Sequence, residues 1–422
     1  MTENETRRPR VMLCAVDLGE YDVERSLDEL EELADTAGAD AVIRITQKRP
    51  AYEPATCIGA GRLEEMAELC DSEDIDQIIF DCELTATQVR NIEAVCDVHT
   101  IDRTTLILDI FAQRATTHEG RIQVEIAQYR YRLPRLAGMG VKLSRLGAGI
   151  GTRGPGESKL ETDKRHIRSR ISALSAELKE IEKRRGLHRQ RRHKDGVLVC
   201  AIVGYTNAGK STLLNTLTEA GVLAENKLFA TLETTSRAIE LPDGRSVMLI
   251  DTVGLISRLP HQLVEAFKST LEEAADADVI LHIVDASNDD CRRQAEVTLE
   301  LLRELGCEGI PVVTVFNKCD LVPYAAELPE DESTVKISAK HGDGIDRMLE
   351  AVAKALPQSA KKMKLLIPFT EGSLLSDIRR EGKIFSEEYT AEGTLIDALV
   401  DAKLYNRVEQ YKFSYTNNGS GK

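Results

Sequence analysis

The sequence has no tryptophan, few aromatic residues and no apolar run of the length that spans a membrane. Aromatic residues make up 4% of its 422 residues, and no stretch approaches the roughly 18 consecutive apolar residues that a transmembrane helix needs. The first ten residues are charged and lack the apolar core of a signal peptide. We therefore expect a cytoplasmic protein, and the length accommodates two to four domains.

Paired cysteines and an excess of positive charge are also missing. The nine cysteines include no C-x-x-C pair, which argues against a zinc site and favours reduced thiols over disulfides. The formal net charge is −15, which argues against a protein that binds nucleic acid over its whole surface. Any contact with RNA or another polyanion therefore needs a local basic region.

A glycine-rich loop at 204–211 has the pattern G-x-x-x-x-G-K-S. The apolar run at 197–203 predicts a buried strand before it, and 212–220 predicts a short helix that stops at Gly221. Strand, loop and helix in this order place nucleotide phosphates at the positive end of a helix, where backbone N–H groups surround them. We therefore predict a phosphate-binding loop.

Three further motifs follow predicted strands at 245–250, 312–316 and 334–337, and one more strand is predicted at 279–285. The D-x-x-G motif at 251–254 combines a carboxylate with a glycine that can approach the third phosphate. The N-K-x-D motif at 317–320 selects guanine, because a carboxylate accepts from both the ring N–H and the exocyclic amine of that base. The S-A-K motif at 338–340 is placed to contact the guanine carbonyl. Together these motifs predict a GTP-binding domain at 195–358.

The first part of the chain, 1–114, predicts a small parallel α/β domain. Predicted strands at 11–16, 41–46, 75–80 and 98–101 alternate with predicted helices at 23–37, 63–70 and 85–95. Between them, Gly59-Ala60-Gly61 is compatible with an anion site at a helix start or with a tight turn, and its spacing favours the turn.

The stretch 115–194 predicts an antiparallel helical arm. Apolar residues at 122, 126, 129 and 133, and again at 167, 171, 174, 178 and 181, form two heptad stripes. The loop between them, 137–158, contains seven glycines and three cations, and 159–194 contains 13 Lys or Arg against 5 Asp or Glu. Such charge runs are commonly solvated coiled-coil faces, but the concentration of one sign favours contact with RNA or another polyanion.

The last part predicts a small α+β domain at 363–415. It has predicted strands at 364–368, 384–389 and 394–399, and predicted helices at 373–380 and 402–410. We find no recognisable chemistry in it and expect a docking role, followed by a disordered tail at 416–422.

Four segments make nearly the whole chain resemble the HflX family of ribosome-associated GTPases, which is related to the Obg and translation-factor-like GTPases. They are 103–115 (RTTLILDIFAQRA), 133–136 (LPRL), 154–163 (GPGESKLETD) and 229–233 (FATLE). The resemblance implies a P-loop GTPase fold, Mg²⁺ as the cofactor, and the large ribosomal subunit with its RNA as the partner of the arm.

The resemblance also implies roles for single residues. Ser211 and Thr231 would bind Mg²⁺, with Thr235 as the alternative to Thr231, and Asp251 would hold the ion through water. The catalytic residues would be Lys210, Thr231 and Gly254. GTP would order the segments 229–233 and 254–260, and hydrolysis would release them. The residues that we predict to bind the nucleotide are Gly204, Tyr205, Thr206, Asn207, Ala208, Gly209, Lys210, Ser211, Phe229, Ala230, Thr231, Leu232, Glu233, Asp251, Thr252, Val253, Gly254, Asn317, Lys318, Cys319, Asp320, Ser338, Ala339 and Lys340.

The sequence departs from related GTPases at three places. Leu255 stands where many small GTPases carry a water-orienting glutamine, which predicts slow hydrolysis without a partner. Asn207 occupies a position that some related GTPases use to hold a monovalent cation, so stimulation by K⁺ is a hypothesis. The arm's tip has GMGVKL at 138–143 and lacks the tryptophan that family members commonly carry there.

The sequence thus predicts a monomeric, GTP-hydrolysing factor that associates with the large ribosomal subunit and favours subunit separation or rescue of stalled ribosomes. The alternative is a signalling GTPase whose arm docks a protein partner. An ATP-dependent RNA-remodelling enzyme with a second nucleotide site in 1–114 is disfavoured, because that part has no second phosphate loop.

Overall fold

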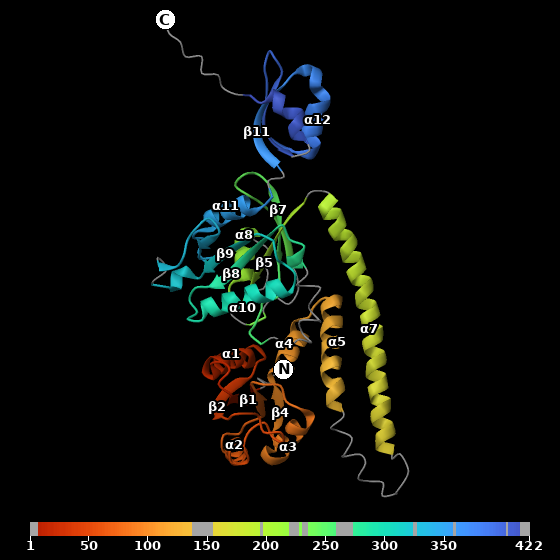
Figure 1. Cartoon of the computed structure of the whole chain (residues 1–422), viewed down its shortest axis with the longest axis vertical. Coiled ribbons are helices and arrows are strands. Elements are labelled where there is room, and N and C mark those ends of the chain that lie inside the picture. The colour runs from red at the N-terminus through yellow and green to blue at the C-terminus, as the bar shows by residue number, and fades with distance from the viewer. Residues whose placement is uncertain are drawn as a thin grey trace, which may run out of the picture.

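A computed structural model describes residues 7–136, 155–194, 197–218, 228–229, 235–258, 273–323, 327–357, 360–401 and 404–413. The domain with the phosphate loop lies between the first α/β domain and the C-terminal sheet, and a long helix runs beside the first two domains (Figure 1). Several predictions fall outside the described residues: most of the arm's tip (137–154), the residues 230–234 and 259–260, and the tail at 416–422. In the described part of the chain, no helix combines the length and apolarity of a membrane span.

The first domain is a parallel four-stranded sheet of order β2-β1-β3-β4, as the alternating pattern predicts. Its elements are β1 (Arg10–Asp17), α1 (Val23–Thr36), β2 (Asp40–Lys48), α2 (Ala60–Ser72), β3 (Gln77–Phe80), α3 (Ala86–Cys96), β4 (His99–Asp102) and α4 (Arg103–Arg114). Helix α4 was not predicted. It begins directly after β4, because the side chain of Asp102 accepts a hydrogen bond from Thr105 N and caps the first turn.

The arm consists of two packed helices, α5 (His118–Arg135) and α7 (Pro155–Lys194), which run side by side in Figure 1. The predicted stripes meet each other: Ile122, Ile126 and Leu174 are buried together, and Tyr129 and Leu178 pack against them. The two-helix hairpin that the heptad spacing predicts is therefore confirmed.

The central domain is a six-stranded sheet of order β10-β9-β8-β5-β7-β6, in which only β6 is antiparallel to its neighbour. Its elements are β5 (Leu198–Gly204), α8 (Lys210–Thr218), β6 (Thr235–Glu240), β7 (Ser246–Asp251), β8 (Val279–Asp285), α10 (Cys291–Glu304), β9 (Val312–Asn317), β10 (Thr334–Lys336) and α11 (Ile345–Ala355). Every residue of β5 is buried, as expected for a central parallel strand. Strand β6 and helices α10 and α11 were not predicted, and α8 begins two residues earlier than predicted, at Lys210.

The C-terminal domain is an antiparallel sheet of order β11-β13-β12. Its elements are β11 (Ala360–Ile367), α12 (Gly372–Glu381), β12 (Lys383–Tyr389), β13 (Thr394–Asp401) and α13 (Tyr405–Val408). The helix predicted at 402–410 is wrong in length, because α13 has only four residues and a 3₁₀ turn (Glu409–Tyr411) follows it. The chain leaves the helix to pair with β11, where Phe413 N donates to Lys364 O at 2.8 Å.

The core of the first domain extends into the central domain. Apolar residues of α1 and α4 form one buried cluster with Leu228, Phe229, Val253 and Ile256. Phe229 and Ile256 belong to the two segments that the sequence predicts to respond to GTP, and Leu228 and Val253 lie directly before those segments. The phosphate loop therefore lies where the two domains meet.

Candidate nucleotide site

The phosphate loop joins the central strand β5 to α8. Gly209 has a φ of 96°, and a Cβ atom there would stand 2.2 Å from Asn317 Nδ2, so a side chain is excluded on both counts. Because α8 begins at Lys210, the positive end of the helix lies at the loop. This arrangement suits a phosphate group.

Lys210 is buried under its own loop. Its Nζ donates to Gly204 O at 3.0 Å and to Tyr205 O at 2.8 Å. Burial lowers the pKa of Lys210 to about 8, against a smaller opposing effect of the Asp251 carboxylate. The side chain is thus held in place without a carboxylate at hydrogen-bond distance among the described residues, and its charge is available to an anion.

Oxygen donors suited to Mg²⁺ lie beside the loop. Ser211 Oγ donates to Asp251 Oδ2 at 3.0 Å, and Asp251 is fully buried at the end of β7, in register with Thr235 of β6. Among the described residues no group of three or more His, Cys, Asp or Glu could hold a metal. An ion here would therefore take most of its ligands from phosphate and water, as Mg²⁺ commonly does. Thr231, the other predicted ligand, is outside the described residues.

The guanine motif is tied to the phosphate loop through Asn317. Its Nδ2 donates to Ala208 O at 2.9 Å, and its Oδ1 accepts from Ala339 N, also at 2.9 Å. One buried amide thereby joins the phosphate loop, the N-K-x-D motif and the S-A-K motif, which are far apart in the sequence. The Asn317 side chain therefore holds three of the predicted nucleotide-binding motifs next to one another.

The two charged residues of N-K-x-D have different partners. Lys318 has a φ of 61° and its Nζ lies 2.6 Å from Asp285 Oδ2 at the end of β8. Hydrogen bonding from Ser338 lowers the pKa of Asp320, so this carboxylate is ionised at neutral pH. Asp320 is thus able to accept from two donors of a base.

Phe229, one of the predicted nucleotide-binding residues, has its side chain and its backbone in different surroundings. Its side chain is 1% exposed in the core of the first domain, with its ring centroid 4.6 Å from that of Phe111. Its backbone remains at the phosphate loop, because Phe229 N donates to Thr206 Oγ1 at 2.8 Å. A sequence pattern cannot reveal a contact that forms only when two domains pack.

A buried polar network joins the first domain to the segment after Gly254. Arg258 Nη2 lies 2.7 Å from Asp81 Oδ2, and Arg103 Nη1 lies 3.0 Å from Asp81 Oδ1. Arg103 also bonds Glu29 and donates to Ser257 O at 3.3 Å. Ser257 and Arg258 lie in the predicted segment 254–260, but the first-domain residues of the network were not predicted. Arg103 could have been found, since it opens the family-specific segment 103–115, whereas Glu29 looks like any acidic residue of a surface helix.

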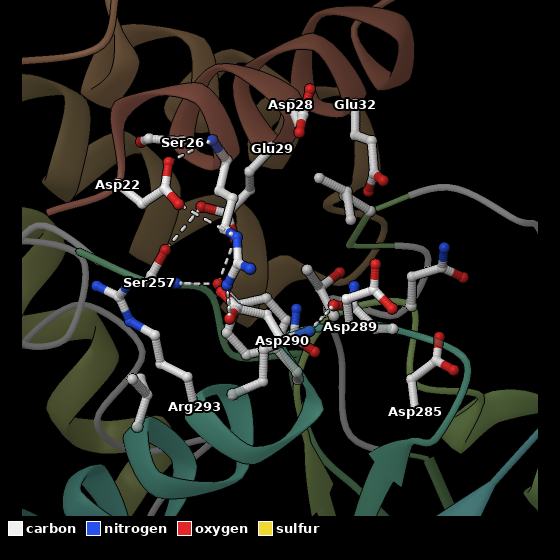
Figure 2. A pocket seen from close by; sticks show the side chains of 18 of the residues that line it. Asp22, Ser26, Asp28, Glu29, Glu32, Ser257, Asp285, Asp289, Asp290 and Arg293 are labelled. Atoms are coloured by element: carbon white, nitrogen blue, oxygen red, sulfur yellow. Dashed lines mark hydrogen bonds and ion pairs between the residues drawn. The ribbon is translucent and has the colours of Figure 1, made fainter. Parts of the chain in front are cut away.

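A cavity of about 470 Å³ lies between α1 and the phosphate loop. Figure 2 shows Asp28, Glu29 and Glu32 on the α1 side and Asp289 and Asp290 on the side that leads into α10. Enclosure between these walls raises the pKa of Glu32, and the negative charge of Glu29 adds to the effect. A nucleotide on the phosphate loop would therefore face an acidic wall.

His282 of β8 is buried near the loop, and neither ring nitrogen has a hydrogen-bond partner among the described residues. Burial, together with the charge of Lys210, lowers the pKa of His282 to about 4. The unfolded chain takes up this proton near pH 6.5. Stability should therefore fall as the pH drops from about 6.5 to about 4, by about 3 kcal/mol from this residue.

Chemical unfolding at about pH 7 and about pH 4.5 measures this effect. A His282→Leu variant should lose less stability between the two pH values than the wild type, whereas His166→Leu, at an exposed position of α7, should behave as the wild type. Equal pH dependence in all three proteins would contradict the prediction.

Three family models match the chain. One described as 50S ribosome-binding GTPase covers residues 199–318, one described as GTP-binding GTPase N-terminal covers 24–112, and one described as GTP-binding GTPase Middle Region covers 114–192. Proteins named GTPase HflX are 49% identical in Lacrimispora saccharolytica (94% of each chain) and 46% in Caldanaerobacter subterraneus (98% of this chain, 96% of that one). The protein of that name from Escherichia coli is 41% identical (87% of this chain, 88% of that one).

A phosphate loop joined through one amide to a guanine-selective motif is the arrangement of a P-loop GTPase, an enzyme that binds GTP and hydrolyses it to GDP and phosphate. The relatives align with the chain over most of their own length and over the first domain and arm as well. The chain belongs to the HflX family of GTPases. The family and the GTPase activity predicted from the sequence are thereby confirmed.

Proposed function

We propose that this GTPase associates with the large ribosomal subunit through its arm and favours subunit separation or rescue of stalled ribosomes. A row of exposed cations on α7 carries the proposal: Arg165, Arg168, Lys179 and Lys183. At 3.6 residues per turn they project from one side of the helix, and the stripe that packs on α5 projects from another. Arg165, Lys179 and Lys183 form no ion pair with a described residue. The 50S ribosome-binding description of the matching family model supports the same partner.

In this proposal the nucleotide lies on the phosphate loop with its base at Asn317 and Asp320. Lys210 contacts the terminal phosphates and Gly254 approaches the third. Ser211 and Thr231 would hold Mg²⁺, with Asp251 acting through water, and the ion would supply charge neutralisation of the phosphates. Residues 204–211, 229–233, 251–254, 317–320 and 338–340 stay the proposed nucleotide contacts.

Hydrolysis by the isolated protein should be slow, because the Leu255 side chain has no group that could orient water. The large subunit would then supply the missing geometry or charge. Hydrolysis would weaken the binding and release the factor, which would work in the cytoplasm as a monomer. The domain limits at 114, 194 and 358, the docking role of 363–415, the contact of the glycine-rich tip with RNA and the K⁺ site at Asn207 stay predictions.

GTP turnover with and without purified large subunits tests the proposal. The rate should rise with subunits, and the rise should weaken steeply with added salt if cations contact phosphates. The triple change Arg165→Glu, Lys179→Glu and Lys183→Glu should abolish the stimulation while nucleotide affinity and basal turnover stay unchanged. Each lost phosphate contact should reduce the slope of log affinity for the subunit against log salt concentration by about one.

A matched triple change serves as the control. Lys48, Arg303 and Lys412 are exposed cations on the first, central and C-terminal domains, and their replacement by glutamate alters the net charge equally. This control should keep the stimulation. Stimulation that survives the α7 changes would rule out the arm as the ribosome contact, and binding to a protein instead of the subunit would favour the signalling alternative.

A further inference from the structure

The segment after Asp251 continues along the phosphate loop as an extra stretch of parallel pairing. Leu255 N donates to Gly204 O at 3.2 Å, and Thr206 N donates to Leu255 O at 2.7 Å. Tyr205 and Leu255 thereby form a parallel bridge. The backbone that follows the D-x-x-G motif is thus bonded to the loop that receives the phosphates.

This pairing brings Gly254 directly against the loop. A Cβ atom on Gly254 would stand 2.8 Å from Thr206 Cα and 3.1 Å from Lys210 Nζ. A third phosphate contacts both the loop lysine and the D-x-x-G glycine in a P-loop GTPase. The segment must therefore move away from the loop before that phosphate fits, whereas a diphosphate does not need the same space.

Two attachments hold the segment in this position. The Leu255 side chain is 2% exposed and belongs to an apolar cluster with Val203 and Ile250. Two residues further on, Ser257 N donates to the Tyr205 hydroxyl at 2.5 Å, and that hydroxyl donates to Glu29. Of the two attachments, burial of the Leu255 side chain contributes more stabilisation, because water would otherwise contact this aliphatic group.

We propose that Leu255 determines the relative affinity of this enzyme for GTP and GDP. Its buried side chain stabilises the conformation in which Gly254 lies on the loop, so GTP binds only at the expense of that burial and GDP does not. The inference rests on the proposed placement of the phosphates on residues 204–211. Full exposure of a leucine side chain shifts such an equilibrium by about 10- to 100-fold.

Titration of wild type and Leu255→Ala with GDP and with a non-hydrolysable GTP analogue tests the proposal. The alanine variant should bind the GTP analogue about tenfold more tightly, while GDP affinity stays within about twofold. Leu255→Met, which keeps an aliphatic side chain of similar volume, should restore the wild-type ratio. A role of Leu255 in folding alone would not change the ratio of the two affinities.

Leu249→Ala is the matched control. Leu249 lies on β7 in a different buried cluster, so the same truncation should lower the thermal unfolding midpoint and leave the nucleotide ratio unchanged. A ratio that is equal in wild type and Leu255→Ala would overturn the proposal. Loss of both nucleotides in Leu255→Ala, with the unfolding midpoint kept, would instead count against the proposed phosphate placement.

Amide exchange in the wild type gives a second reading that needs no variant. The Leu255 and Thr206 amides should be protected with GDP and exchange faster with the GTP analogue, because both take part in the bridge. Equal protection in the two states would also overturn the proposal. Ribosomal subunits are absent from all of these experiments, so their outcome is independent of the ribosome proposal.

Discussion

Replacement of Asp320 by asparagine should exchange guanine for xanthine as the preferred base, with a loss of GTP affinity of about 1,000-fold. Guanine presents two neighbouring donors, the ring N–H and the exocyclic amine, and an ionised carboxylate accepts from both. A carboxamide has one acceptor and one donor end, so it faces the amine of guanine with a donor. Xanthine carries a carbonyl in place of that amine, and therefore matches the asparagine.

The structure around Asp320 should stay the same in the variant. The carboxylate is ionised at neutral pH, and Asn317, which joins the loops, does not depend on it. Competition of GTP and XTP for the protein measures the switch. Asp331→Asn, an equal change at an exposed loop residue of the same domain, should leave the preference for GTP intact. A variant that loses GTP without gaining XTP would mean that Asp320 has another role.

The parts of the site that the sequence predicts are those that a short segment forms by itself. A strand, a glycine-rich loop and a helix start make the phosphate site within one stretch of chain, and N-K-x-D follows the end of one strand. Contacts between distant segments are not encoded in that way. Phe229 packs on Phe111, and Glu29 meets Tyr205, only because two domains meet at the loop.

The role of Leu255 illustrates the same limit. The missing glutamine is visible in the sequence and predicts slow hydrolysis. The sequence does not reveal that Leu255 is buried or that its backbone pairs with the loop. Both features depend on how the segment after β7 lies against β5. The predicted length of helix α13 is wrong for a similar reason, because pairing of the last residues with β11 competes with helix formation.

Replacement of Arg103 by methionine should destabilise the first domain by about 3–5 kcal/mol. Arg103 and Asp81 are 3% and 1% exposed, and the ion pair between them is 3.0 Å long. Among the described residues, removal of the guanidinium leaves Asp81 with Arg258 as its one remaining ion-pair partner and Glu29 without its buried cation. A buried carboxylate that loses its partner costs far more than the pair contributes, because the charge has already left water.

Calorimetric unfolding of the whole chain, with circular dichroism as a second probe, measures the loss. Arg44→Met is the control, since Arg44 pairs with Asp28 and Glu31 at the surface and should cost less than about 1 kcal/mol. A double change of Arg103→Met with Asp81→Leu should recover part of the loss, because it removes the stranded charge together with its partner. If Arg103→Met and Arg44→Met destabilise the protein equally, the network between the domains is no stronger than a surface ion pair, and its burial does not stabilise the contact.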